Sequence, residues 1–103
     1  MDQTRGTYLM TKINMGNEGK FLSGRSRALE LVDRIMESQP SLPLTLDFTG
    51  VGSVSQSFIS ELLFILKDRG IQLHEIQFTG VKDKAIDARI KREIERLSQL
   101  IAI

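Results

Sequence analysis

The residues best suited to chemistry gather in one stretch, LDFTGVGSVSQSFISE, at positions 46–61. It contains the carboxylates of Asp47 and Glu61 and, among other hydroxyls, those of Ser55 and Ser57. A hydroxyl close to a carboxylate can accept a phosphate group or bind an arginine of a partner. Serine is also a preferred residue for the first position of a helix. The stretch is therefore either a functional surface, a helix start, or both.

Catalysis by this stretch is not supported by the rest of the sequence. The single histidine, His74, lies outside it, and the chain has no Gly-x-Ser-x-Gly motif. Because there is no cysteine, the sequence excludes thiolate nucleophiles, disulfides and cysteine zinc sites. Asp47 and Glu61 alone are too few carboxylates for a magnesium site without a phosphate ligand. We expect no enzymatic activity, no metal and no cofactor.

Length and composition indicate one ordinary globular domain that spans residues 1–103, with 41% hydrophobic and 26% charged residues. Fourteen basic residues nearly balance thirteen acidic ones, so the charge does not favour nucleic acid as a partner. Over residues 82–96 basic and acidic side chains alternate, including Glu93, which is typical of a solvated helix face. The apolar run at 62–66 is too short to cross a membrane, and MDQTRG shows no secretory signal. We expect a cytoplasmic protein without a membrane segment.

The elements that must position the stretch follow from periodicity. Strand composition is seen at 7–13, 42–48 and 71–79, with a short further strand at 21–22. Apolar residues recur at helical spacing from Ser26 to before Pro40, from Ser55 to Arg69, and over 82–100. This alternation predicts an α/β domain with about four strands in a mainly parallel or mixed sheet and three main helices. The strand at 42–48 is apolar enough to be central, and we expect helices on one face of the sheet.

This order of elements places Ser55, Gln56 and Ser57 at a strand-to-helix turn, where free backbone N–H groups and the positive end of the helix suit an anion. Either Ser55 or Ser57 is expected to cap this helix, and we predict its start near Ser57, so that Ser57→Ala costs about 1 kcal/mol. Gly70 is expected to end it. Ser23 or Ser26 is the expected cap of the preceding helix.

Three further side chains are candidates for partner binding. Glu61 lies one helical turn after Ser57, so the two share a face. Phe64 departs from the apolar stripe of its helix, and we expect it to be an exposed anchor for a partner. Arg25 precedes a helix whose dipole does not favour a positive charge. We therefore expect Arg25 to pair with Asp47, with Glu61, or with an acidic residue of a partner.

The stretch LTLDFTGVGSVSQSFISELLFIL, residues 44–66, resembles the strand–loop–helix signature of the STAS superfamily of sulfate transporter and anti-sigma-factor antagonist domains. Together with FLSGRSRALELV at 21–32, and Ser57-Phe58 followed by Glu61, it resembles more closely a bacterial STAS-like family of unknown function. The likeness spans residues 21–97. The residues that match the superfamily pattern in order are Leu46, Asp47, Thr49, Gly50, Val51 and Val54.

The resemblance implies a STAS-like fold and a non-catalytic regulatory role in signalling, similar to that of an anti-sigma-factor antagonist. It also implies a protein partner, such as a histidine-kinase-like ATPase, bound through residues 55–61. The serine that is phosphorylated in those antagonists aligns with Gln56, which has no hydroxyl. Ser55 and Ser57 flank that position and are the candidate phosphorylation sites. The alternative is a small-ligand or nucleotide-sensing domain that uses the same turn as an anion site.

Overall fold

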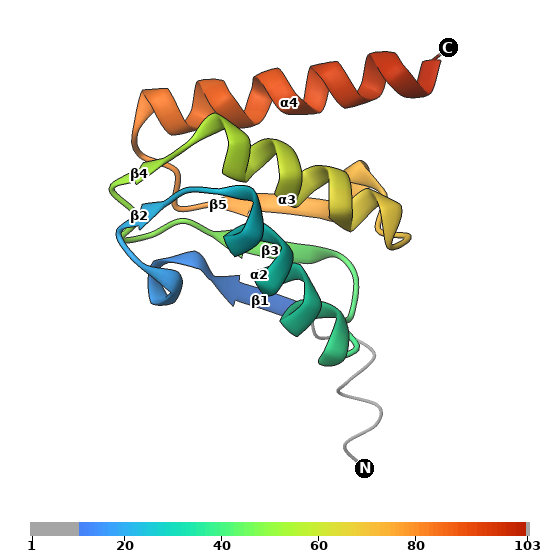
Figure 1. Ribbon diagram of the computed structural model, residues 1–103, viewed down its shortest axis with the longest axis horizontal. Coiled ribbons are helices and arrows are strands. Elements are labelled where there is room, and N and C mark those ends of the chain that lie inside the picture. The colour runs from blue at the N-terminus through green and yellow to red at the C-terminus, as the bar shows by residue number, and fades with distance from the viewer. Residues whose placement is uncertain (1–10, 103) are drawn as a thin grey trace.

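The structure, a computed structural model, describes the backbone of residues 11–102 and the side chains of residues 11–99. It is an α/β domain of three α-helices and two small parallel sheets (Figure 1). In chain order, the elements are β1 (Thr11–Asn14), η1 (Met15–Glu18), β2 (Phe21–Leu22), α2 (Arg25–Glu37), β3 (Leu44–Asp47), β4 (Ser53–Val54), α3 (Gln56–Asp68), η2 (Leu73–Glu75), β5 (Ile76–Thr79) and α4 (Lys84–Ala102).

The main sheet has the strand order β1-β3-β5, and both pairings are parallel. The prediction that β3 is the central strand is confirmed, since Leu44 pairs with Thr11 on one side and Ile76 on the other. Parallel strands that follow one another in the chain need crossover connections, which α2 and α3 provide.

The predicted count of about four strands in one sheet is wrong. Within residues 11–102 there are five strands, three in the main sheet and two, β2 and β4, in a separate parallel sheet. The short strand expected at 21–22 is confirmed as β2. The strand that the sequence did not predict is β4, because periodicity cannot reveal a strand of two residues. The strand expected at 71–79 is shorter, because residues 73–75 form η2 instead. Of the strand expected at 7–13, residues 7–10 lie outside the described part of the chain.

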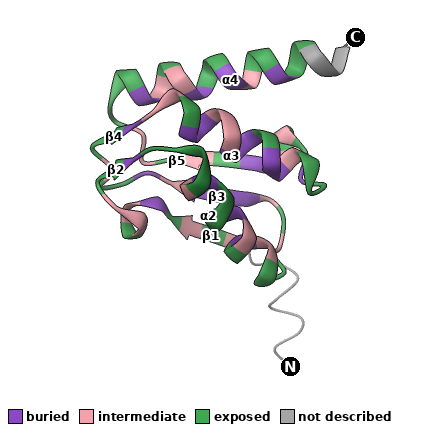
Figure 2. Cartoon of the chain, viewed as in Figure 1, coloured by how far each residue is buried: buried purple, intermediate pink, exposed green. Residues whose placement is uncertain are grey.

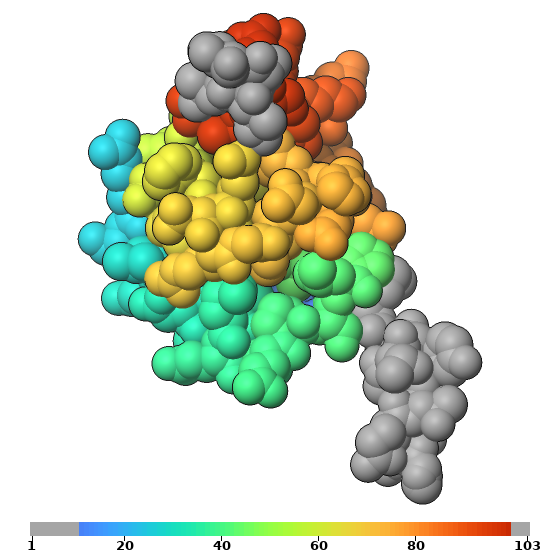
Figure 3. Space-filling model, turned by 90° about the vertical axis from the view of Figure 1, so that its right-hand side faces the viewer, coloured from blue at the N-terminus to red at the C-terminus, as the bar shows by residue number. Residues whose placement is uncertain are grey.

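Helices α2 and α3 lie side by side on one face of the main sheet, and α4 runs along α3 (Figure 1; Figure 3). The side chains of a strand alternate between faces, so Leu44 and Leu46 of β3 point toward the helices. Thr45, between them, points to the opposite face, where its hydroxyl lies 3.4 Å from Gln77 Oε1. Buried residues therefore gather between the sheet and the helices (Figure 2).

The ends of the helices follow local rules with two corrections. Gly70, with φ 99°, ends α3 as expected, and its N–H donates to the Lys67 carbonyl. The expectation that Ser23 or Ser26 caps α2 is wrong, because Gly24 occupies that position and no side chain caps the helix. Helix α4 begins two residues later than predicted, where Asp83 accepts the N–H group of Ala85 at 2.7 Å.

The loop after β3 is closely packed against Gly80, the residue that follows the neighbouring strand β5. A Cβ atom on Gly80 would collide with Thr49 Oγ1 and Asp47 Oδ1, and Gly80 has φ 69°. Glycine alone combines this backbone conformation with so close an approach. This contact fixes the position of the loop where it leaves β3.

Within residues 11–102, no helix is long and apolar enough to cross a membrane.

Candidate functional site

The two serines at the strand-to-helix turn have different roles. Ser55 is the residue that caps α3, because its Oγ accepts the N–H of Phe58 at 3.1 Å. Ser57 lies inside the first turn with an exposed side chain, and its Oγ is 3.1 Å from that of Ser55. Of the two serines expected to cap α3, Ser55 is therefore the cap, and the prediction that Ser57→Ala removes a cap is wrong. The hydroxyl of Ser57 is the one that faces solvent.

Gln56 joins α3 to α4. Its side-chain amide donates to Glu93 Oε2 at 2.8 Å and lies 3.4 Å from the Arg89 carbonyl oxygen. The interpretation of Glu93 as part of a solvated face is wrong, because Glu93 is only 4% exposed. A buried carboxylate is stable only when it is hydrogen-bonded. The Nε group of Arg96 is the second donor, 3.0 Å from Glu93 Oε1.

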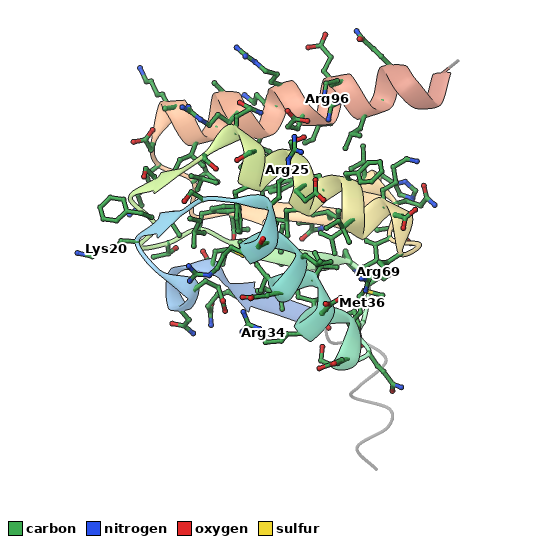
Figure 4. The ribbon with its side chains drawn as sticks, in the orientation of Figure 1. Lys20, Arg25, Arg34, Met36, Arg69 and Arg96 are labelled. Carbon is green, nitrogen blue, oxygen red and sulfur yellow. The ribbon has the colours of Figure 1, made fainter. Side chains whose placement is uncertain are left out.

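Arg96 extends this network toward the outer side of α3. Its second donor group, Nη2, lies 3.0 Å from Ser60 Oγ (Figure 4 labels Arg96 on α4). The series from Gln56 through Glu93 and Arg96 to Ser60 is thus a polar connection between the two helices. Alternating charge in the sequence does not reveal it, because it depends on which side of α4 packs against α3.

Arg25 and Glu61 form a loose ion pair between α2 and α3, with 3.9 Å between Nε and Oε1. This matches one of the pairings expected for Arg25. A second pair, Asp33 with Arg69 at 2.7 Å, has the same sequence separation, so the two helices run parallel with a constant offset. Figure 4 shows Arg25 near the first turn of α3 and Arg69 near its end.

Exposed apolar side chains lie between these two ion pairs. Leu29, one turn after Arg25, is 43% exposed, and Phe64, on the next turn of α3 after Glu61, is 51% exposed. The prediction that Phe64 is exposed is confirmed. We call the surface of α2 and α3 formed by Arg25, Leu29, Ser57, Glu61 and Phe64 the α2–α3 face.

Asp47 belongs to a local turn on the other side of the sheet. Its Oδ1 accepts the backbone N–H of Thr49 at 3.0 Å and the Thr49 hydroxyl at 2.7 Å, and Lys12 Nζ lies 3.3 Å from Oδ2. The Thr49 hydrogen bonds, followed by Lys12, hold the pKa of Asp47 below its ordinary range. Because Leu46 points toward the helices, the neighbouring Asp47 points away from them. The structure thus separates Asp47 from the α2–α3 face.

Sequence reasoning missed a second set of functional candidates, Arg89 and Arg92 of α4. They line a depression of about 320 Å³ beside Gln56 at the start of α3. The alternating charges around Arg89 and Arg92 do not reveal this depression in the sequence, because the depression depends on the small side chains of Ala85 and Ala88. Among the described residues, no cluster of histidine and acidic side chains could hold a metal ion.

Comparison of the chain with protein-family models, with curated proteins and with solved structures finds no match. The assignment of a function therefore depends on the geometry of the α2–α3 face and of the turn that begins α3.

Proposed function

We propose that this chain is a non-catalytic regulatory domain that binds a protein partner through the α2–α3 face. The observation that carries the proposal is the exposure of Phe64, 51%, in the middle of a helical surface that also exposes Leu29. Large exposed apolar side chains close to one another are a feature of interaction sites, and aromatic residues are frequent among the side chains that dominate binding energy.

The charged residues beside Phe64 suit the rim of such an interface. The side chains of Arg25 and Glu61 are 75% and 32% exposed, and their closest atoms are 3.9 Å apart. An exposed pair at this distance contributes little to stability. Arg25 and Glu61 can therefore give up their mutual contact and pair with charged groups of a partner at a small cost in free energy. Such pairs would give the interface specificity.

The resemblance to STAS-like domains supports the same surface. It suggests a cytoplasmic bacterial signalling role and a partner such as a histidine-kinase-like ATPase, which would contact the start of α3. Of the two candidate phosphorylation sites, we favour Ser57, because Ser55 Oγ already accepts a backbone N–H as the helix cap. A phosphate on Ser57 would add up to about two negative charges one turn before Glu61 and would repel an acidic partner surface.

The test uses the tagged chain as bait in lysate of its native host, followed by binding measurements with the purified partner. The two test variants are Glu61→Lys and Phe64→Ser. Each has a matched control elsewhere, Glu95→Lys on the exposed side of α4 and Leu42→Ser, at a side chain that is 43% exposed. We expect each test variant to weaken binding by about thirtyfold, which corresponds to a loss of ~2 kcal/mol, while the controls bind as the wild type does.

Thermal melts of all four variants separate binding from folding, since each substituted side chain is at least partly exposed. A partner that binds both test variants with wild-type affinity would show that the α2–α3 face is not the interface. If the two control variants weakened binding as much as the two test variants, the conclusion would be the same.

A further inference from the structure

The first half of α4 borders a groove made of three adjoining depressions. A smaller depression of about 100 Å³ shares Ala85 and Arg89 with the one of about 320 Å³ beside Gln56. A third, of about 240 Å³, shares Ile86 with the second and reaches the loop after β3. The shared lining residues place the three depressions next to one another, and together we call them the α4 groove. It runs from the start of α3 to the carboxyl end of β3.

The α4 groove has an excess of positive charge. It is lined by Arg89, Arg92 and Lys82, and within residues 11–99 none of the three forms an ion pair. Nε of Arg89 is buried without a hydrogen-bond partner among the described groups. Asp83, the acidic residue of the lining, uses its Oδ1 to accept backbone N–H groups at the start of α4.

Glu93, one turn after Arg89, does not neutralise the arginines. Its carboxylate is nearly buried and accepts hydrogen bonds from Gln56 and Arg96 instead. A buried guanidinium nitrogen without an acceptor is costly for a folded protein. Arg89 and Arg92, which form no ion pair within residues 11–99, are therefore available to an anionic ligand.

We propose that the wide end of the α4 groove binds the phosphate group of a phosphorylated small molecule. Arg89 and Arg92 are three residues apart on α4, so they share one side of the helix. Guanidinium groups present N–H donors in a planar fork that matches phosphate oxygens. The first turn of α3, at Gln56, also lines the wide end and adds the positive end of its dipole.

The rest of the lining determines the size and kind of ligand. The methyl groups of Ala85 and Ala88 give the wide end an apolar wall, as in most small-molecule sites. Its volume of about 320 Å³ lies at the lower end of the range for such sites. This favours a compact phosphoester, with the groove toward the loop after β3 available for the remainder of the molecule. The site is on the α4 side of α3 and does not depend on the proposed partner.

The test is a titration of the ¹⁵N-labelled full chain followed by NMR, with inorganic phosphate, adenosine 5′-monophosphate, adenosine and a phosphoserine peptide as separate probes. We expect saturable shifts of the amides of residues 56–57 and 85–92 with phosphate and with the nucleotide, and none with adenosine. Arg92→Gln and Arg89→Gln should each weaken nucleotide binding by about tenfold or more. Lys91→Gln is the matched control, because Lys91 is exposed on α4 and pairs with Asp87 at 3.0 Å.

Three results would overturn the proposal. The first is an unsaturable shift spread over the basic surface of α4, and the second is an equal loss of affinity in Lys91→Gln. The third is binding of the phosphoserine peptide alone, which would make the groove a site for a phosphorylated protein. Arg92 is exposed, so Arg92→Gln decides the outcome even if Arg89→Gln does not fold.

Discussion

The different roles of Ser55 and Ser57 give the sharpest prediction from the structure. Ser55→Ala removes the side-chain acceptor of the Phe58 N–H group, a hydrogen bond of 3.1 Å at the first turn of α3. Loss of such a cap costs about 1 kcal/mol, within a range of about 0.5–2 kcal/mol. For a domain of 103 residues, an unfolding entropy of about 2.1 cal/mol/K per residue converts this loss into a fall in Tm of about 4–5 °C.

Ser57→Ala should behave differently, although it is the same substitution two residues later. The Ser57 side chain is exposed and accepts no backbone N–H group. Alanine also has the higher helix propensity at a position inside the helix. We therefore expect the free energy of unfolding of Ser57→Ala to stay within about 0.5 kcal/mol of the wild-type value.

Urea denaturation followed by circular dichroism, with calorimetry for Tm, measures both effects. Ser55→Asp serves as the control, because aspartate also caps helices well and should retain most of the stability. A loss in Ser57→Ala equal to or larger than that in Ser55→Ala would refute the assignment of the cap. So would a Ser55→Asp variant as unstable as Ser55→Ala.

Two further predictions concern Gln56 and Asp47. Gln56→Ala should lower the free energy of unfolding by about 1–3 kcal/mol in urea denaturation, because it leaves the buried Glu93 carboxylate without its amide donor; a change below 0.5 kcal/mol would contradict the interpretation of Gln56 as a link between helices. The folded state lowers the pKa of Asp47, so the stability that this carboxylate contributes is complete above its ordinary pKa of about 3.9 and is lost as the pH falls through the lowered value. The difference in unfolding free energy between wild type and Asp47→Asn should accordingly be constant from pH 5 to 7 and shrink below about pH 4; a difference that grows on acidification would have the wrong sign.

The sequence alone determined the order of the three main strands and three helices, although not β4 or the second sheet that it forms with β2. The apolar strand at 42–48 and the helical spacing around it required a central strand followed by a crossover helix, because only that arrangement buries both patterns. Gly70 ended α3 as expected, since a left-handed C′ position is a local property of the backbone. The exposure of Phe64 also followed from its position outside the apolar stripe of its own helix.

Tertiary structure alone decided which polar residues meet. Ser55 and Ser57 are equally good caps by composition, and the path of the chain through β4 determined which of them begins α3. The burial of Glu93 arises because α4 lies against the first turn of α3, where Gln56 is available to bind it. The same packing joins Arg89 and Arg92 to that turn and creates the α4 groove. Contacts between helices depend on their relative rotation and offset, and the periodicity of either helix by itself contains no information about those two quantities.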